Sequence, residues 1–209
     1  MTLPNQLTIL RIILTPIFLY LFLSKDPLLI QISLLVFFIA ALTDWYDGWL
    51  ARKFNYITDW GKFWDPLADK ILTSTAFIGF VLVGLLPFWM VLLTVIRDLI
   101  VTLLRIYAAS RGYNFITSYY AKWKTVLQMV FLYYLLLLYV GLNSKEIYSG
   151  NENFFAYLSN EQFIYSTMLV ITIITVHSGA AYLIKNKQLI EKLFNESNKL
   201  VLALLFVSP

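Results

Sequence analysis

Long apolar runs separated by short polar connections are the dominant pattern along the chain. Each run approaches the roughly 20 residues that a helix needs to cross the hydrocarbon core of a bilayer. The pattern therefore predicts an all-α integral membrane protein with six transmembrane helices, at 7–23, 28–49, 65–86, 87–109, 122–142 and 162–184. The polar stretches 52–63 and 143–161 are predicted to be connections.

The first apolar run carries a charge in its interior, at Arg11. A secretory signal would place its positive charge before the apolar run and a cleavage site of small residues after it. The sequence LFLSKD that follows the run is a poor cleavage site. We therefore expect a retained segment, with a short N-terminal interfacial helix before the first transmembrane helix.

Composition supports the membrane class. The chain of 209 residues is 60% apolar and has a mean hydropathy of +0.73, which indicates an integral membrane protein and not a soluble domain. No cysteine is present, so disulfides and a thiol nucleophile are excluded, and a single histidine excludes a multi-histidine zinc site. We expect one membrane-embedded domain over residues 1–209, with membrane lipids and not nucleic acid as its surroundings.

Lysine and arginine gather at one end of the predicted helices. They are concentrated in 52–63, in 110–124 and in the C-terminal tail, whereas the opposite end carries only Lys25 and Lys145 beside several acids. Positively charged connections stay in the cytoplasm. Six helices then place both termini on the cytoplasmic side of the cell (inner) membrane.

Four aspartates, Asp44, Asp47, Asp65 and Asp69, lie in or beside apolar segments at that same end. The members of each pair are three or four residues apart, so they share a helix face. An aspartate at mid-membrane costs roughly 2.5–3.5 kcal/mol on insertion scales, and close carboxylates resist joint ionisation. Divalent cations would offset both penalties because carboxylate oxygens suit Mg²⁺, Mn²⁺ and Ca²⁺. The alternative is a set of structural acids neutralised by arginine and lysine.

Small residues and one cation complete this stretch. Gly48 lets a ligand approach the helix closely, and Arg52, one turn later, could pair with a phosphate. The full motif reads D-x-x-D-G-x-x-A-R-x8-G-x-x-x-D-x-x-x-D, with members Asp44, Asp47, Gly48, Ala51, Arg52, Gly61, Asp65 and Asp69. It resembles the signature of the CDP-alcohol phosphotransferase family.

That resemblance implies a fold, a cofactor and a set of contacts. It implies two divalent ions, Mg²⁺ or Mn²⁺, held by the four aspartates, with Asp69 as the general base. It also implies a homodimer, and contacts to the CDP-lipid from Asn5, Thr8, Gly48, Arg52 and Thr58.

A second group of charged residues lies in the fourth predicted helix, at Arg97, Asp98 and Arg105. An ionisable residue inside a membrane segment is a functional-site hypothesis by default, although an Arg97–Asp pair could simply join two helices. Further cations follow on the same side of the membrane. If the second substrate, which accepts the transferred group, carries a phosphate, the candidates for binding that phosphate are Arg105, Arg111, Lys122 and Lys124.

The stretches IRDLIVTLLR and AKWKTVLQM resemble the phosphatidylglycerophosphate synthase branch of the family, as do LPNQLTILR and SGAAYLIKN. Asp98 stands where that branch usually has Glu, which keeps the charge and shortens the reach. The resemblance implies transfer of the phosphatidyl group from CDP-diacylglycerol to glycerol 3-phosphate, with release of CMP.

The sequence is compatible with three other functions. The basic acceptor group does not separate glycerol phosphate from phosphatidylglycerol or inositol phosphate, so cardiolipin synthesis and phosphatidylinositol-phosphate synthesis are alternatives. A divalent-cation transporter is an alternative of another class. A transporter would need acids near the midplane with access from both sides, whereas these aspartates are predicted at one membrane face.

Overall fold

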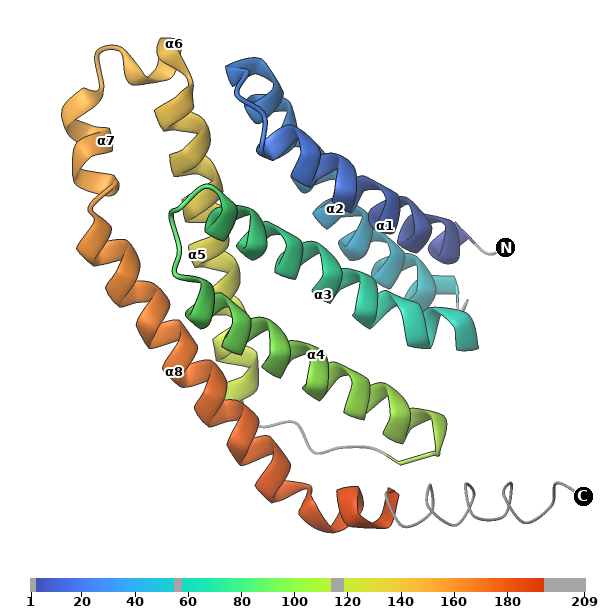
Figure 1. The fold of residues 1–209 in the computed structure, drawn as a ribbon. Helices are drawn as coiled ribbons and strands as arrows, with labels where there is room; N and C mark the ends of the chain where they lie inside the picture. Colours follow the sequence, from blue (N-terminus) through green and yellow to red (C-terminus); the bar gives the residue numbers. More distant parts are fainter. Residues whose placement is uncertain (1–2, 55–57, 114–118, 194–209) are drawn as a thin grey trace, which may run out of the picture.

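The computed structural model describes residues 3–54, 58–113 and 119–193, and all regular elements in this part of the chain are helices. Six of them are long and two are short (Figure 1). In chain order they are α1 (Leu3–Phe22), α2 (Pro27–Phe54), α3 (Asp59–Leu82), α4 (Phe88–Ser110), α5 (Tyr119–Asn143), α6 (Lys145–Tyr148), α7 (Glu152–Leu158) and α8 (Glu161–Lys185).

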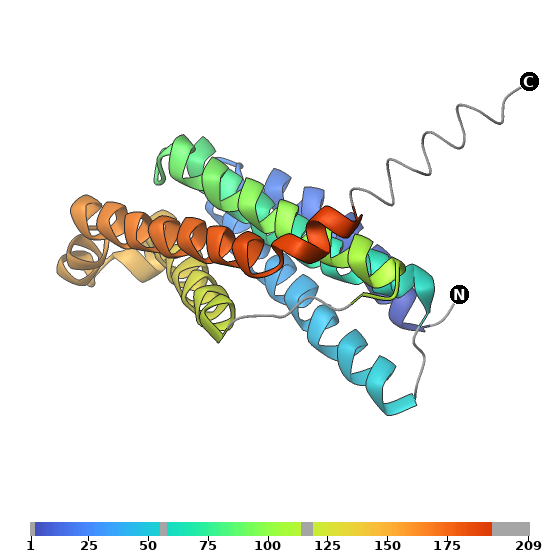
Figure 2. The ribbon, with the colours of Figure 1, turned by 90° about the horizontal axis from the view of Figure 1, so that it is seen from below.

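The six long helices contact one another in a closed order. α1 packs on α3, α3 on α4, α4 on α8, α8 on α5, α5 on α2, and α2 returns to α1. The short helices α6 and α7 lie together at the end of the bundle where α5 leads into α8 (Figure 1). At the other end, the last turns of α2 project beyond the rest of the bundle (Figure 2).

Aromatic rings fill the space between α1, α2 and α3. Phe22 on α1 meets Phe80 on α3 edge to face at 5.2 Å, and Phe18 lies 5.2 Å from Phe37 on α2. Gly79 allows this close approach, because a Cβ there would lie 3.1 Å from the ring of Phe22. The rings therefore fix α1 firmly against the helices that carry the aspartates.

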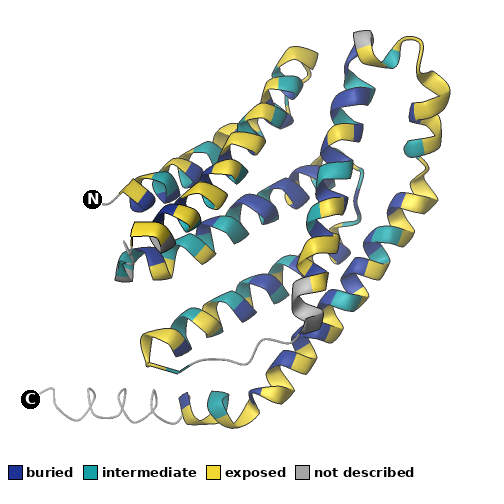
Figure 3. Cartoon of the chain, turned by 180° about the vertical axis from the view of Figure 1, so that it is seen from behind, coloured by how far each residue is buried: buried dark blue, intermediate teal, exposed yellow. Residues whose placement is uncertain are grey.

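The outside of the bundle is apolar. Large side chains such as Leu35, Leu137 and Ile173 are about three-fifths exposed, and buried residues follow the inward faces of the helices (Figure 3). Four spans in the described part of the chain are long and apolar enough to cross a membrane, namely Leu3–Phe22, Pro27–Leu50, Trp123–Asn143 and Glu152–Lys185. The chain is thus an all-helical, multi-pass membrane protein.

The N-terminus differs from the expected arrangement. α1 is one continuous helix from Leu3, so the short interfacial helix predicted before the first apolar run is not a separate element. Proline at the start of a helix removes an N–H that has no intrahelical partner, so Pro4 does not interrupt α1. The Thr8 hydroxyl oxygen lies 3.1 Å from the Pro4 carbonyl oxygen, one turn earlier in α1.

α3 begins earlier than the apolar pattern predicts, at Asp59 and not at residue 65. Thr58 caps the helix, because its side chain accepts a hydrogen bond from the Gly61 N–H at 3.0 Å. Asp65 and Asp69 therefore lie inside a formed helix, which continues through Pro66. The connection predicted at 52–63 is correspondingly shorter, since α2 extends to Phe54.

Packing of the aromatic rings predicts the effect of truncating Phe80, which is fully buried. Phe80→Ala removes the ring that meets Phe22 and leaves a cavity, so it should cost about 3–5 kcal/mol of stability. The measurement is thermal unfolding in detergent. Phe154→Ala is the matched control, because that ring is 59% exposed and its loss should change stability little. Equal destabilisation by both variants would contradict this packing.

Candidate functional site

Asp44 and Asp47 in the last turns of α2 face a single arginine from α1. One terminal nitrogen of Arg11, Nη1, lies 2.7 Å from Oδ1 of Asp44, and the other, Nη2, lies 2.6 Å from Oδ2 of Asp47. The Arg11 side chain is fully buried, Asp47 is 4% exposed, and Asp44 is 44% exposed. The pair of carboxylates is therefore closed on the α1 side and open on the side of Asp44.

Asp65 on α3 is tied to α1 as well. Its Oδ1 accepts a hydrogen bond from the Thr8 hydroxyl at 2.5 Å. Asn5, one turn earlier, accepts from the Thr58 hydroxyl at 2.9 Å. A Cβ on Gly61 would lie 3.1 Å from both the Asp65 carboxylate and the Thr58 hydroxyl, so glycine there leaves room for both groups.

Asp69 completes the group of aspartates. Asp44 and Asp47 on α2 and Asp65 on α3 all bond to side chains of α1, and Asp44 is close enough to Asp65 and Asp69 for their charges to repel one another. Asp69 is 27% exposed, and its Oδ2 lies 3.2 Å from Nζ of Lys70. The structure brings the four predicted aspartates to one end of the bundle, between α1, α2 and α3.

The donor chemistry fits divalent cations, since carboxylate oxygens are the ligands that hard cations prefer. The described side chains do not include three acids or histidines already placed around one point for a metal ion. The guanidinium of Arg11 supplies a positive charge between Asp44 and Asp47 instead. A cation that used the same oxygens would take the place that this guanidinium now occupies.

A cavity of about 570 Å³ opens beside Asp69, between α3, α4, α5 and α8. Its wall combines cations with polar and apolar side chains. The residues that line it are Pro66, Asp69, Lys70, Arg97, Asp98, Val101, Thr102, Arg105, Thr125, Val126 and Tyr182. The three cations on the wall, Lys70, Arg97 and Arg105, outnumber its two carboxylates, Asp69 and Asp98, so the wall is suited to an anionic group such as a phosphate.

A network of charged side chains holds Arg97 in place. Arg97 donates to the Asp98 carboxylate and to the Ser178 hydroxyl on α8, each at 3.0 Å. Lys124 on α5, only 1% exposed, donates to the same oxygen of Asp98 at 2.5 Å. Gly179 leaves space for Arg97, because a Cβ there would lie 2.8 Å from its side chain. Asp98 thus joins α4 to α5 and orients Arg97.

The predicted acceptor residues take different positions. Arg105 lines the cavity, and its contact with an acceptor phosphate stays a prediction. Lys124 is buried against Asp98, so its ammonium contacts a protein carboxylate and is not on the described cavity wall. Arg111 is exposed at the end of α4, 5.6 Å from the ring of Tyr107. The side chains of Lys122 and Arg52 lie outside the described part of the structure.

Apart from Arg52, whose side chain is outside the described part, the predicted CDP-lipid contacts lie near the aspartates. Asn5, Thr8 and Thr58 form the hydrogen bonds between α1 and α3, and Gly48 follows Asp47 on α2. Thr8 contacts Asp65 directly, and Asn5 and Thr58 bond to each other near the same carboxylate. Their contact with a lipid stays a prediction.

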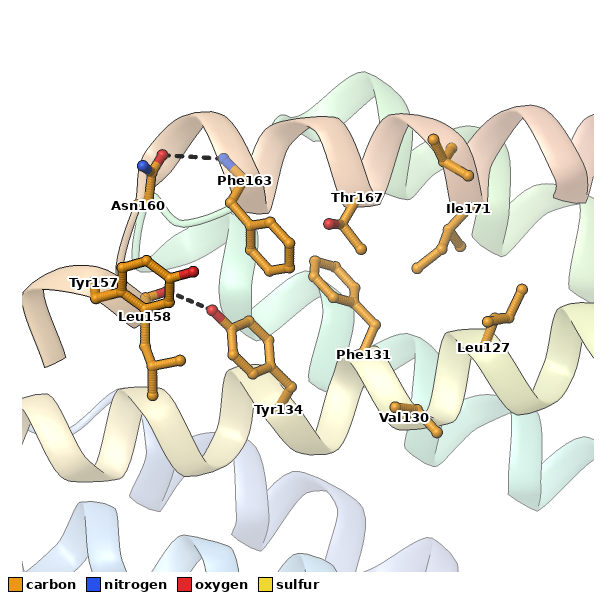
Figure 4. Close-up of a pocket in the computed structure, with 11 residues that line it drawn as sticks. Leu127, Val130, Phe131, Tyr134, Tyr157, Leu158, Asn160, Phe163, Thr167 and Ile171 are labelled. Atoms are coloured by element: carbon orange, nitrogen blue, oxygen red, sulfur yellow. Dashed lines mark hydrogen bonds between the residues drawn. The ribbon is translucent and has the colours of Figure 1, made fainter. Parts of the chain in front are cut away.

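A second cavity, of about 540 Å³, lies between α5, α7 and α8 (Figure 4). Its wall is almost entirely apolar, including Leu127, Phe131, Phe163 and Ile171. The Tyr134 hydroxyl at its edge donates to the Leu158 carbonyl. This wall contains none of the predicted site residues and no charged side chain in the part that the structure describes, so it offers no group for the chemistry.

Sequence reasoning missed two cations at this site, Arg11 and Lys70. The signal for Arg11 was its position inside an apolar run, where an ionisable residue marks a functional hypothesis; it served only to argue against a signal peptide. Lys70 follows Asp69 directly, and neither spacing nor periodicity reveals that its side chain reaches the cavity wall.

The sequence model of the CDP-alcohol phosphatidyltransferase family matches residues 1–176. The chain belongs to this family. The match includes the four aspartates, the cavity cations on α3 and α4, and most of α8.

Three curated relatives illustrate where the chain stands within the family. All three are named CDP-diacylglycerol–glycerol-3-phosphate 3-phosphatidyltransferase. The protein of Bacillus subtilis is 40% identical over 147 residues, which are 65% of this chain and 76% of that protein. The Mycoplasma genitalium protein is 31% identical over 175 residues (82% and 71%). The Haemophilus influenzae protein is 39% identical over 137 residues (62% and 72%).

The network around Asp98 predicts a coupling between Asp98 and Lys124. Asp98→Asn leaves the buried ammonium of Lys124 without a counter-charge, which should cost on the order of 3 kcal/mol of stability. The double variant Asp98→Asn/Lys124→Met removes both charges and should recover most of that loss. Thermal unfolding of the two single variants and the double variant measures the coupling. Additive losses would show that the two side chains do not act as a pair.

Proposed function

We propose that this protein transfers the phosphatidyl group from CDP-diacylglycerol to sn-glycerol 3-phosphate, giving phosphatidylglycerophosphate and CMP for phospholipid biosynthesis. The observation that carries the proposal is the position of Asp69, which borders both the group of aspartates and a cavity lined by cations. The names of the relatives and the family match support the same reaction.

The reaction is a substitution at phosphorus. The acceptor hydroxyl oxygen attacks the phosphatidyl phosphorus, the bond from this phosphorus to the CMP oxygen breaks, and the hydroxyl proton passes to a base. Asp69 is the proposed base, because it is partly exposed and lies on the cavity wall where the acceptor would bind. A base must come within hydrogen-bond reach of the proton that it takes.

Asp44, Asp47, Asp65 and Asp69 are the proposed ligands of two divalent ions, Mg²⁺ or Mn²⁺. Such ions, when bound, would neutralise the diphosphate and the charge that develops on the departing CMP. Gly48 and Arg52 would contact the nucleotide diphosphate, the first by close approach and the second by charge. Asn5, Thr8 and Thr58 would form the α1 side of the same site, beside Asp65.

The acceptor phosphate is proposed to bind in the cavity through Arg105, with Arg97 and Lys70 beside it. Arg97 has its orientation set by Asp98 and Ser178, so its guanidinium needs little reorganisation to receive an anion. Lys124 would act through Asp98. Arg111 and Lys122 are proposed to attract the anionic acceptor from the aqueous side.

The distribution of charge supports an orientation. Arg52, Lys53 and Lys62 lie at the aspartate end, as do most lysines after residue 184, and positively charged connections stay in the cytoplasm. We infer that the six long helices cross the cell membrane and that the site faces the cytoplasm. A homodimer, which the family resemblance implies, is part of this proposal and can be checked by cross-linking in membranes.

An acceptor panel tests the reaction against its alternatives. Purified protein in detergent with CDP-diacylglycerol and Mg²⁺ should release CMP when glycerol 3-phosphate is added. Phosphatidylglycerol, inositol phosphate and serine should give much slower release. Preference for phosphatidylglycerol or inositol phosphate would assign the chain to another activity of the family, and metal flux into sealed vesicles without CDP-lipid would favour a transporter.

Replacing the proposed base gives a sharper outcome. Asp69→Asn keeps the size of the side chain and removes the proton acceptor, so turnover should fall by roughly 10²-fold or more. Binding of CDP-diacylglycerol, measured separately, should change far less. A variant that keeps the wild-type rate would remove Asp69 from this role.

Variants of Arg97 and Arg111 distinguish binding of the acceptor in the cavity from binding at the protein surface. Arg97→Gln should raise the KM for glycerol 3-phosphate by roughly tenfold or more, because a charge-assisted hydrogen bond contributes about 1.5–3 kcal/mol. Arg111→Gln should change KM by less than about threefold, since exposed charges contribute little at physiological salt. Initial rates at varied acceptor concentration measure both. Equal effects would place the phosphate outside the cavity.

A further inference from the structure

The side chain of Arg11 joins two oxygens that the proposed metal site also needs. Its Nη1 and Nη2 lie 2.7 Å and 2.6 Å from oxygens of Asp44 and Asp47. Both acids belong to the proposed ligand set. A metal ion bound to these oxygens and a guanidinium in its present position would compete for the same lone pairs and would repel each other.

Arg11 is held incompletely. Only its contact with Asp47 has hydrogen-bond geometry. Nη1 meets Asp44 at 2.7 Å without hydrogen-bond geometry, and the buried Nε has no hydrogen-bond partner within the described residues. A buried polar group without a partner raises the free energy of the state that contains it. This guanidinium can therefore be displaced more readily than one held on both arms by well-directed hydrogen bonds.

The same pairing is useful when no metal is present. Asp44 also interacts with the charges of Asp65 and Asp69, and repulsion among these carboxylates would open the contact between α2 and α3. Arg11 supplies a counter-charge from a helix that packs on both α2 and α3. It can do so because α1 is fixed by the Phe18 and Phe22 rings, about two and three turns further along.

We infer that Arg11 is a built-in counter-cation, which neutralises Asp44 and Asp47 in the metal-free protein and is displaced when a divalent ion binds. The inference rests on the proposed metal site. Arg11 then competes with the metal ion and lowers its affinity. Metal affinity is then set partly by the free energy needed to move this side chain.

The test compares wild type with Arg11→Gln, purified in detergent and freed of metal. Mn²⁺ alone is the probe, and the free Mn²⁺ signal in electron paramagnetic resonance gives the dissociation constant. Thermal unfolding with and without Mn²⁺ is the second readout. Arg11→Gln should unfold at a lower temperature than wild type without metal, bind Mn²⁺ roughly tenfold or more tightly, and gain more thermal stability from it.

Two variants serve as controls. Arg11→Lys keeps the charge but loses the fork of donors, so its Mn²⁺ affinity should lie between those of wild type and Arg11→Gln. This variant also keeps the test valid if Arg11→Gln does not fold. Lys53→Gln removes one positive charge from the same end of α2, where the ammonium lies over the Trp49 ring, and should leave Mn²⁺ affinity unchanged.

Each result bears on a different statement. If the Arg11 variants bind Mn²⁺ as wild type does, or more weakly, the inference is overturned and the metal site stands. If wild-type affinity for Mn²⁺ is the same in Asp47→Asn, or if no form of the protein binds Mn²⁺, the proposed metal site fails and the inference fails with it. An equal gain in affinity for Lys53→Gln would reduce the effect to net charge and overturn the specific role of Arg11.

Discussion

Carboxylates inside an apolar bundle must be compensated, and this requirement governs the arrangement of the charged residues. Arg11 lies between Asp44 and Asp47, and Lys124 and Arg97 share Asp98. In both places the counter-charge comes at least partly from another helix. The ion pairs therefore fix which helices are neighbours and how those helices are aligned along their axes. They also reduce the cost of burying the charges.

The two charged groups meet along α3. The aspartates lie on the side of α1 and α2, and the cations of the cavity lie on the side of α4, α5 and α8. Asp69 and Lys70 are consecutive residues, so they connect an acidic half with a basic half over a very short distance. The proposed divalent ions suit the acidic half and the proposed anionic acceptor suits the basic half, so the donor and acceptor substrates would bind side by side.

Much of this could be predicted from the sequence. The six apolar runs correspond to the six long helices, because each run is about as long as a helix that spans a bilayer. The spacing of Asp44, Asp47, Asp65 and Asp69 predicted one shared face for each pair. The start of α3 was missed because a capping threonine and a polar first turn carry no apolar signal. The roles of Arg11, Lys70 and Lys124 were missed because a long cationic side chain can reach several partners, and tertiary packing decides among them.

The position of Asp69 has a consequence for the order of bond making and breaking. One residue of α3 borders both the carboxylates proposed to hold the nucleotide and the cavity proposed to hold the acceptor. Both substrates can then be present together, and neither needs to leave before the other arrives. Such a layout favours a single direct displacement with inverted stereochemistry at phosphorus, without a phosphatidylated protein on the route.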